Sequence, residues 1–488
     1  MVIESLKYKI LQQFGFAPTQ EQGQALDTFV SFLTDRDPQA VMILRGSAGT
    51  GKTSLSGAIV RTLLQIRQKV MLLAPTGRAA KVFSLGSGAP AYTIHRRIYR
   101  EKAFAGVDGQ FSLNDNLYTD TLFMVDEASM IANMGLGGTT FGSGCLLDDL
   151  VKFVYQGHND RLLLIGDKAQ LPPVGEEESP ALSASVMEGY GLKVYECDLN
   201  EVLRQSQSSG ILYNATLIRQ MITHDAVTGL PLICFKGFAD IVMMPGAELV
   251  ESLGDSYHHV GMDETMVITR SNKRANIYNN GIRNMVLDRE EELSSGDMLM
   301  IVKNNYFWTE KEKKESGEGS AGAVPTFLAN GDRAKVLRVS NYIELYGFRF
   351  ATLLLQLPDY DDYEMQVTGM LDTLQSEAPA LTHEQQEELF RQVEEDYQHF
   401  VPLKADRMKS IRQDAYFNAL QIKYAYAVTC HKAQGGQWAH VYVDQGYMTD
   451  DMLTPDYIHW LYTAFTRATD KLFLVNWPKE QTCEPTDL

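Results

Sequence analysis

The feature that most constrains the fold is a run of eight residues at 46–53, with the sequence GSAGTGKT. An apolar segment at 40–44 precedes it, and a helix-like segment at 54–64 follows it. Two glycines separated by four residues and followed by Lys-Thr form the P-loop pattern. Glycines let backbone N–H groups turn inward around phosphate oxygens, and the helix N-terminus adds partial positive charge. The sequence therefore predicts an α/β domain that binds a nucleoside triphosphate.

Two side chains of this run have defined expected roles. Lys52 would reach the β- and γ-phosphates, and the Thr53 hydroxyl would hold Mg²⁺. The alternative interpretation is a glycine-rich turn without a ligand. The residues expected around the nucleotide are Gly46, Ala48, Gly49, Thr50, Gly51, Lys52, Thr53 and Ser54.

A second strand end carries two adjacent carboxylates, Asp126 and Glu127, directly after the apolar segment 122–125. Such a pair is costly at the end of a buried strand unless it has a partner, and beside a P-loop that partner is Mg²⁺. Asp126 would bind the metal through Thr53 or water, and Glu127 would orient and deprotonate the attacking water. The alternative is a solvated strand end.

Two further polar residues allow two interpretations each. Gln22 stands three residues after Thr19, the spacing of a capping box, but an amide can also recognise an adenine edge because it donates and accepts at once. Thr76 follows the strand-like segment 69–74, where a parallel sheet places ligands, and it can equally be a helix N-cap.

Composition excludes several protein classes. The longest apolar stretches fall far short of the ~18 residues of a membrane span. The N-terminus lacks a basic region followed by an apolar run, so we expect no secretory signal. The five cysteines are scattered and never two residues apart, which argues against a disulfide framework and a zinc site. We expect a cytoplasmic protein, in a bacterial-type cytosol or nucleoid, whose 488 residues form about three or four domains.

The net charge of −18 taken alone argues against a nucleic-acid partner. The charge is uneven, however, because residues 351–415 hold 14 acidic and 5 basic residues, about half of the excess. A basic groove elsewhere in the chain is compatible with this distribution.

The pattern of elements changes along the chain. Strand–turn–helix repeats before about residue 300 predict parallel sheets. Residues 310–320 are charged and glycine-rich, so we expect a mobile tip there. The turn signal at 330–333 between alternating runs predicts a small antiparallel β unit, and 382–420 is expected to be helical and acidic.

Seven segments in this order resemble the motif set of superfamily 1 helicases, and most closely the 1B branch, which includes RecD, phage Dda and the Pif helicases. The segments are 46–53, 74–81, 93–95, 126–129, 166–175, 429–435 and 462–468. Singly the last two are weak, but seven in order are highly specific.

The resemblance implies an α/β fold of two RecA-like P-loop NTPase domains with parallel sheets, a small 1B insertion and an SH3-like, β-containing 2B insertion. N-terminal helices with a Q-like motif would occupy 1–35. Domain 1A would span 36–198, with the 1B pin at 97–120. Domain 2A would comprise 199–303 and 421–488, and domain 2B would span 304–420.

The resemblance also implies site residues. ATP would lie between domains 1A and 2A, with Gln170 sensing its γ-phosphate and Arg204 and Arg467 neutralising charge on that group. Gln22 would contact adenine, and Gly435 would join the nucleotide site. The alternative for Arg204 is a surface ion pair.

Single-stranded DNA would lie across both domains. Candidate contacts are Thr76, Arg78 and His95 on domain 1A and Thr429, His431 and Lys432 on domain 2A. Hydroxyl, imidazole and ammonium groups bind phosphates without reading sequence. The alternative for His95 is a satisfied buried histidine.

The resulting expectation is an ATP- and Mg²⁺-dependent helicase that unwinds forked duplex DNA while translocating 5′ to 3′ on a single strand. We expect it to act as a monomer and without a membrane partner. An RNA helicase on the same fold is one alternative. A nucleotide-gated module that remodels protein–DNA complexes without unwinding is the other.

Overall fold

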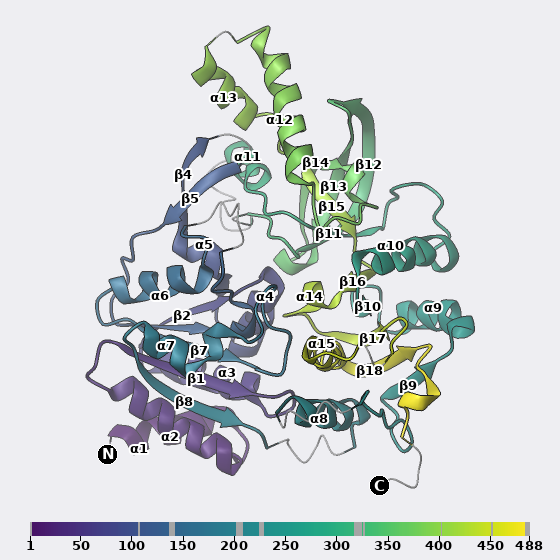
Figure 1. The fold of residues 1–488 in the computed structure, drawn as a ribbon. Coiled ribbons are helices and arrows are strands. Elements are labelled where there is room, and N and C mark those ends of the chain that lie inside the picture. The colour runs from purple at the N-terminus through teal and green to yellow at the C-terminus, as the bar shows by residue number, and fades with distance from the viewer. Residues whose placement is uncertain are drawn as a thin grey trace. The chain divides into compact units, whose positions relative to one another are not determined.

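The computed structural model describes residues 2–105, 108–135, 142–201, 208–223, 229–316, 325, 327–401, 403–449 and 452–483. Arg204, a predicted site residue, lies outside them. The chain forms two units, and Figure 1 labels their elements. Unit 1 comprises Met1–Arg100, Ser112–Gly246 and Ala433–Leu488, and unit 2 comprises Glu101–Phe111 and Ala247–Lys432.

A six-stranded parallel sheet lies at the centre of unit 1, with the order β3-β2-β6-β7-β1-β8. Strands β1, β6 and β7 are buried along their whole length, as expected for a sheet covered on both faces. The strands are β1 (Ala40–Gly46), β2 (Lys69–Ala74), β3 (Ala91–Thr93), β6 (Thr121–Val125), β7 (Arg161–Gly166) and β8 (Lys193–Leu199). Because the three buried strands are parallel neighbours, the residues that follow them gather at one edge.

Helices cover this sheet. The first two, α1 and α2, pack with α3 and β8 around a core that includes Phe29 and Leu199. The helices are α1 (Val2–Phe14), α2 (Gln20–Thr34), α3 (Lys52–Gln65), α4 (Gly77–Ser87), α5 (Ile94–Ile98), α6 (Leu146–Gln156) and α7 (Ala184–Gly189).

A second set of parallel strands in unit 1 has the order β17-β18-β9, with α8 and α15 packed against each other beside it. The elements are α8 (Gly210–Thr223), β9 (Ile241–Met244), β17 (Trp438–Asp444), α15 (Pro455–Phe465) and β18 (Ala468–Val475). Two sets of parallel strands agree with the predicted α/β class. Among the described residues, no helix combines the length and the apolar character needed to span a bilayer.

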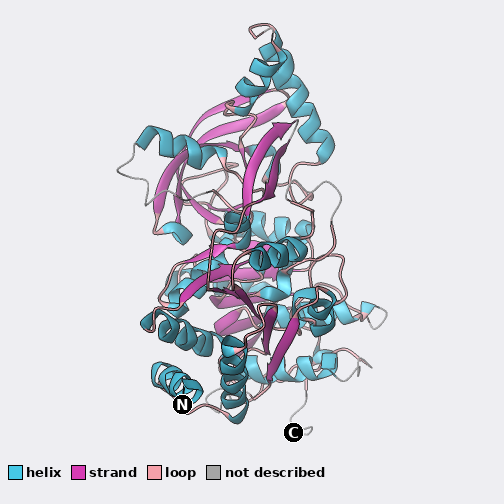
Figure 2. Ribbon diagram, turned by 90° about the vertical axis from the view of Figure 1, so that its left-hand side faces the viewer, coloured by secondary structure: helices cyan, strands magenta, loops and turns pink. Residues whose placement is uncertain are grey.

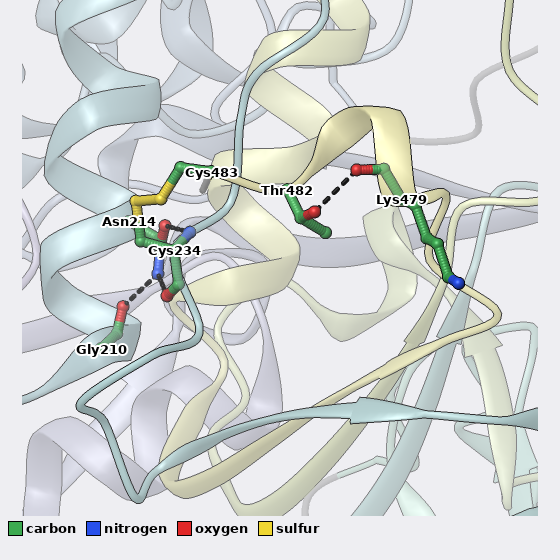
Figure 3. Close-up of a disulfide and its surroundings, with 6 residues drawn as sticks. All are labelled: Gly210, Asn214, Cys234, Lys479, Thr482 and Cys483. Atoms are coloured by element: carbon green, nitrogen blue, oxygen red, sulfur yellow. Dashed lines mark hydrogen bonds between the residues drawn. A yellow bond between two sulfur atoms is a disulfide. The ribbon is translucent and has the colours of Figure 1, made fainter. Parts of the chain in front are cut away.

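A disulfide joins Cys234 to Cys483 in unit 1, with their Cα atoms 5.1 Å apart (Figure 3). The backbone pairs on either side of it, since Ile233 N–H donates to Gln481 O at 2.9 Å and Cys483 N–H donates to Ile233 O at 3.0 Å. The Asn214 amide of α8 bonds both backbone groups of Cys234. The sequence-based argument against disulfides is wrong for this pair, because 249 residues separate the two cysteines and only the fold brings them together.

Unit 2 contains a closed five-stranded barrel, which confirms the predicted β-containing insertion. Its strands are β11 (Met298–Ile301), β12 (Arg333–Leu345), β13 (Phe348–Leu357), β14 (Tyr363–Met370) and β15 (Leu420–Tyr424). The prediction of a mobile tip at 310–320 is wrong for residues 310–316, because they belong to helix α11 (Phe307–Ser316). Further elements from Ala247 onward are α9 (Leu249–His259), β10 (Thr265–Thr269), α10 (Asn272–Gly281), β16 (Ala427–Thr429) and α14 (Cys430–Ala433).

The acidic segment after 380 forms α12 (His383–Gln398) and α13 (Lys404–Arg412), which Figure 2 shows beside the barrel strands. Leu389, Val393 and Ile411 of this pair are buried against Phe348 and Phe350 of β13. The acidic residues thus form the outer faces of helices whose inner faces pack on the barrel.

The predicted insertion at 97–120 contains a two-stranded hairpin of β4 (Tyr99–Ala105) and β5 (Asp108–Leu113). Within unit 2 the Phe111 ring lies 4.9 Å from that of Tyr306, which stacks on Phe327 at 4.7 Å. The predicted boundaries of domains 1A, 1B, 2A and 2B stay predictions.

Candidate nucleotide-binding and DNA-binding sites

The P-loop joins β1 to α3 in a conformation that its glycines permit. Gly49 and Gly51 have φ values of +76° and +79°, which side chains with a Cβ rarely adopt. A Cβ on Gly46 would lie 3.0 Å from the Lys52 side chain and from Leu199. The backbone therefore encloses the Lys52 stem closely.

The Lys52 ammonium lies inside the loop. It donates to the carbonyl oxygens of Gly46 and Ser47, the latter at 3.0 Å. Phosphate oxygens are stronger acceptors than carbonyls for a charged donor, so a triphosphate can take over these bonds. This position agrees with the predicted role of Lys52.

Gln22 forms the capping box that its spacing indicates. Its Oε1 accepts from Thr19 N–H at 3.0 Å, and its N–H donates to the Thr19 hydroxyl at 3.3 Å. Its Nε2 donates to Thr50 O at 2.9 Å, so the same side chain also supports the P-loop. The capping alternative is confirmed, and the adenine contact stays a prediction.

The two carboxylates after β6 differ in environment. Asp126 Oδ1 accepts from Glu127 N–H at 2.9 Å, and Glu127 adopts a left-handed backbone with φ +52°. Burial, and then the neighbouring Glu127 charge, raise the pKa of Asp126 to about 7, while Lys52 acts in the opposite direction. A cation beside Asp126 would favour its ionised form.

A chain of hydrogen bonds connects Glu127 to Arg467 through Gln170. With the Gln170 amide oriented to suit its neighbours, its nitrogen donates to Glu127 Oε2 at 3.2 Å and its oxygen accepts from Arg467 Nη2 at 3.3 Å. Three residues predicted from distant motifs thus meet in one unit. A shift of the Arg467 guanidinium would therefore move the Gln170 amide and, through it, the Glu127 carboxylate.

Arg467 itself is buried, at 2% exposure, and its bonds hold it against the C-terminal end of α15 and a neighbouring loop. Its Nε donates to Thr463 O and its Nη1 to Gly436 O, both at 3.1 Å, and its Nη2 donates to the Thr466 hydroxyl at 3.2 Å. Contact with a phosphate requires some of these bonds to exchange.

The Tyr462 hydroxyl connects α15 to the P-loop. It donates to Asp167 Oδ2 at 2.6 Å and accepts from Ala48 N–H at 3.0 Å. One turn of the same helix lies against the segment after β7, because Leu171 N–H donates to the Thr463 hydroxyl at 2.8 Å. A movement of α15 would therefore shift or break the bond between the Tyr462 hydroxyl and the P-loop.

The DNA candidates of unit 1 gather around α4. The Thr76 hydroxyl caps this helix by accepting from Ala79 N–H at 3.2 Å, so the capping alternative is confirmed. Arg78 Nη2 donates to Gln437 O at 2.7 Å, and its guanidinium lies 4.6 Å from the Trp438 ring centroid.

Gly435 lies beside α4 and has φ +73°, and a Cβ there would come within 3.0 Å of the Thr76 hydroxyl. The atoms nearest to that Cβ belong to Thr76 and Ala79. His95 packs its ring against Tyr99 at 5.6 Å, and burial lowers the pKa of its imidazole to about 4. His95 is therefore neutral at pH 7 and would meet a phosphate as a hydrogen-bond donor.

The remaining DNA candidates lie in unit 2. Thr429 ends β16, and His431 and Lys432 lie on the following short helix α14. The His431 side chain is exposed. Burial, and then the charge of Lys423, lower the pKa of Lys432 to about 8. An anion near this pair of lysines would stabilise both charges.

Comparison with known protein families agrees with this geometry. Residues 17–228 match the AAA domain family, and residues 424–475 match the UvrD-like helicase C-terminal domain family. The chain is therefore similar to these two families over those residues. The fold class is the predicted pair of RecA-like domains with inserted β structure, and an AAA domain implies nucleotide use.

Two curated relatives that match parts of this chain are helicases. It is 30% identical to the ATP-dependent RecD2 DNA helicase of Deinococcus radiodurans over 157 residues, which cover 32% of this chain and 18% of that protein. It is 25% identical to the ATP-dependent DNA helicase Dda of Enterobacteria phage T4 over 267 residues, covering 53% and 55%. The chain thus spans about half or less of the length of these two relatives.

A solved structure with a similar course of the chain is the Pif1 helicase from Bacteroides in complex with ADP-AlF3 and single-stranded DNA. The alignment covers 96% of this chain and 95% of that chain, with 13% identity and a TM-score of 0.46.

Sequence reasoning missed three side chains of this candidate site. Tyr462 lies within a recognised segment, but no pattern indicates that its hydroxyl bonds the P-loop. Trp438 follows the segment that ends at Gly435, and only the fold places it on Arg78. Arg219 belongs to none of the seven segments and contacts the P-loop from α8.

Proposed function

We propose that this chain is an ATP-dependent DNA helicase that translocates 5′ to 3′ on single-stranded DNA. The observation that carries the proposal is the chain of bonds from Glu127 through Gln170 to Arg467. It connects a carboxylate placed to activate water with an arginine placed to stabilise the transferring phosphoryl group. A site of this kind hydrolyses efficiently only when both groups are in position, which couples hydrolysis to conformation.

In the proposed reaction Lys52 binds the β- and γ-phosphates, and Glu127 accepts a proton from the attacking water. Gln170 fixes the Glu127 carboxylate and the Arg467 guanidinium relative to each other through its two hydrogen bonds. Arg467 exchanges bonds to the C-terminal end of α15 for bonds to the γ-phosphoryl oxygens. Arginines in this role contribute about 10³–10⁵ in rate.

The donor set suits Mg²⁺. Asp126 and the exposed Thr53 hydroxyl would hold it. In the parts of the chain that the structure describes, no group of three or more His, Cys, Asp or Glu side chains is arranged so that it could hold a metal ion. Mg²⁺ commonly takes one or two carboxylates together with substrate phosphates and waters, so a smaller set is sufficient. When bound, the ion neutralises phosphate charge.

We propose that the chain binds single-stranded DNA and moves along it. The candidate contacts of unit 1 are Thr76, Arg78 and His95, and those of unit 2 are Thr429, His431 and Lys432. Phosphate contacts from a chain with a net charge of −18 should weaken steeply with added salt, because binding releases counterions from the DNA. We propose that the chain acts as a monomer on forked duplex DNA.

The first test is ATP hydrolysis with and without single-stranded DNA, in the wild type and in Lys52→Ala. We expect stimulation by DNA in the wild type and no turnover in the variant, with an unchanged melting temperature. Lys479→Ala, an exposed lysine of the same unit, is the matched control and should hydrolyse normally. Full turnover in Lys52→Ala would refute the site.

The second test is unwinding of forked substrates with only a 5′ or only a 3′ tail. Unwinding of the 5′-tailed substrate is expected, and unwinding of the 3′-tailed one alone would refute the proposed direction. Equal or stronger stimulation of hydrolysis by single-stranded RNA would favour an RNA helicase. Hydrolysis without strand separation would favour a remodeller of protein–DNA complexes.

A further inference from the structure

Arg219 lies against the P-loop, although no recognised motif contains it. It is a half-buried residue of α8, and its Nη1 donates to the Ser47 hydroxyl at 2.8 Å and to Asn200 Oδ1 at 3.1 Å. The chain before Asn200 is itself attached to the loop, because Ser47 N–H donates to Leu199 O at 3.3 Å. Two bonds therefore fix the guanidinium at the second residue of the P-loop.

Two cations converge on Ser47. Lys52 Nζ donates to its carbonyl at 3.0 Å, while Arg219 donates to its hydroxyl. The P-loop lysine marks the site of the β- and γ-phosphates, so Ser47 lies at the phosphate end of the nucleotide. Two positive charges placed this close repel each other unless an anion shares them. The terminal phosphates of a nucleotide are such an anion.

The contacts of Ala48, the next residue of the P-loop, also place the Arg219 guanidinium near this part of the loop. Tyr462 bonds Ala48 N–H, one residue beyond Ser47. Burial and the Asp167 carboxylate raise the pKa of the Tyr462 hydroxyl, and the charge of Arg219 acts weakly against them. Arg219 therefore lies close enough to this hydroxyl to influence it.

Arg219 differs from Arg467 in how far it must move. Arg467 is buried and bonded to Thr463 of α15 and to Gly436, so it must exchange those bonds to reach a phosphate. Arg219 already contacts the loop that holds the phosphates. A bond from the guanidinium to a phosphate oxygen joins two opposite charges, whereas the bond to the Ser47 hydroxyl joins a charge to a neutral group, so exchange of the hydroxyl for phosphate is favourable.

We propose that Arg219 contacts the γ-phosphate and gives the site its preference for a nucleoside triphosphate over a diphosphate. This inference rests on the proposed ATP site at the P-loop. Because α8 packs against α15, the contact also connects the presence of the γ-phosphate to the helix that carries Tyr462. A diphosphate does not provide the oxygen that Arg219 would bind, so loss of the γ-phosphate would release α8.

The test measures equilibrium binding of fluorescent ADP and of a fluorescent non-hydrolysable ATP analogue, with Mg²⁺, to full-length variants. In Arg219→Ala we expect affinity for the triphosphate to fall about tenfold or more, and affinity for the diphosphate to change less than about twofold. Arg219→Lys should restore part of the difference because it keeps the charge but loses the planar fork. Arg36→Ala, an exposed arginine of unit 1, is the control and should match the wild type.

The outcomes separate this inference from the proposed function. If Lys52→Ala weakens both nucleotides and Arg219→Ala weakens neither, the ATP site stands and the role of Arg219 fails. If Lys52→Ala also changes nothing, the site itself is wrong. Equal loss of both nucleotides in Arg219→Ala would make the residue structural. A loss in Ser47→Ala as large as in Arg219→Ala would show that the arginine acts through the loop hydroxyl, which overturns the direct contact.

Discussion

Replacing Tyr462 by phenylalanine removes one oxygen that joins three parts of the nucleotide site. The hydroxyl is at the end of a side chain that is 1% exposed, and its acceptor Asp167 is 4% exposed. The variant keeps the ring and its packing. It removes the bond to Asp167 Oδ2 at 2.6 Å and the bond from Ala48 N–H at 3.0 Å.

The magnitude follows from the partners. A bond to a charged group contributes about 1.5–3 kcal/mol, and a neutral one about 0.5–1.5 kcal/mol. The Asp167 carboxylate keeps its bond from Ala169 N–H at 3.0 Å, so it is not left entirely without donors. We therefore expect Tyr462→Phe to lower the free energy of unfolding by about 2–4 kcal/mol.

Tyr457 on the same helix provides a matched control. It is 2% exposed, and its hydroxyl donates to the neutral Gln445 Oε1 at 2.5 Å, away from the P-loop. Tyr457→Phe should cost about 0.5–1.5 kcal/mol. Urea unfolding of both variants, followed by intrinsic fluorescence, measures the difference. If Tyr462→Phe costs no more than Tyr457→Phe, the bond to Asp167 does not stabilise the site as argued.

Three further predictions concern other parts of the chain. Arg467→Ala should lower the rate of ATP turnover about 10³-fold or more while the nucleotide still binds; loss of binding in equilibrium titrations would make the residue structural. Burial raises the pKa of Asp332 to about 7 from 3.8. Between these two values the folded state keeps a proton that the unfolded state has lost. The resulting contribution to stability is present at acidic pH and is lost as pH rises through about 7. The free energy of unfolding of Asp332→Asn relative to that of the wild type should accordingly rise by up to ~4 kcal/mol between pH 4 and pH 8. If urea unfolding gives the same dependence on pH for both proteins, the prediction is wrong. Cys483→Ser should lower the free energy of unfolding under oxidising conditions by about 2–4 kcal/mol, since the bond to Cys234 closes a loop of 249 residues; an equal difference in the presence of a thiol reductant would show that the cross-link is not the cause.

The nucleotide half of the site could be predicted from sequence because it is local. The P-loop and the Asp126–Glu127 pair depend on strand ends and on short spacings, and parallel strands bring such ends to one edge. Gln170 and Arg467 followed only from the order of seven motifs along the chain. The capping roles of Gln22 and Thr76 were also available from spacing, because a cap involves residues three positions apart.

The sequence by itself determined the residue types of the candidate nucleotide site, the α/β class and the resemblance to a helicase family. Tertiary structure alone decided which side chains meet across long separations. It placed Arg219 on Ser47, 172 residues away, and Tyr462 on Ala48, 414 residues away. It also paired Cys234 with Cys483, against the expectation from their spacing. The physical reason is that periodicity and caps report on neighbours within a few residues, whereas contacts between distant segments depend on how helices and strands pack.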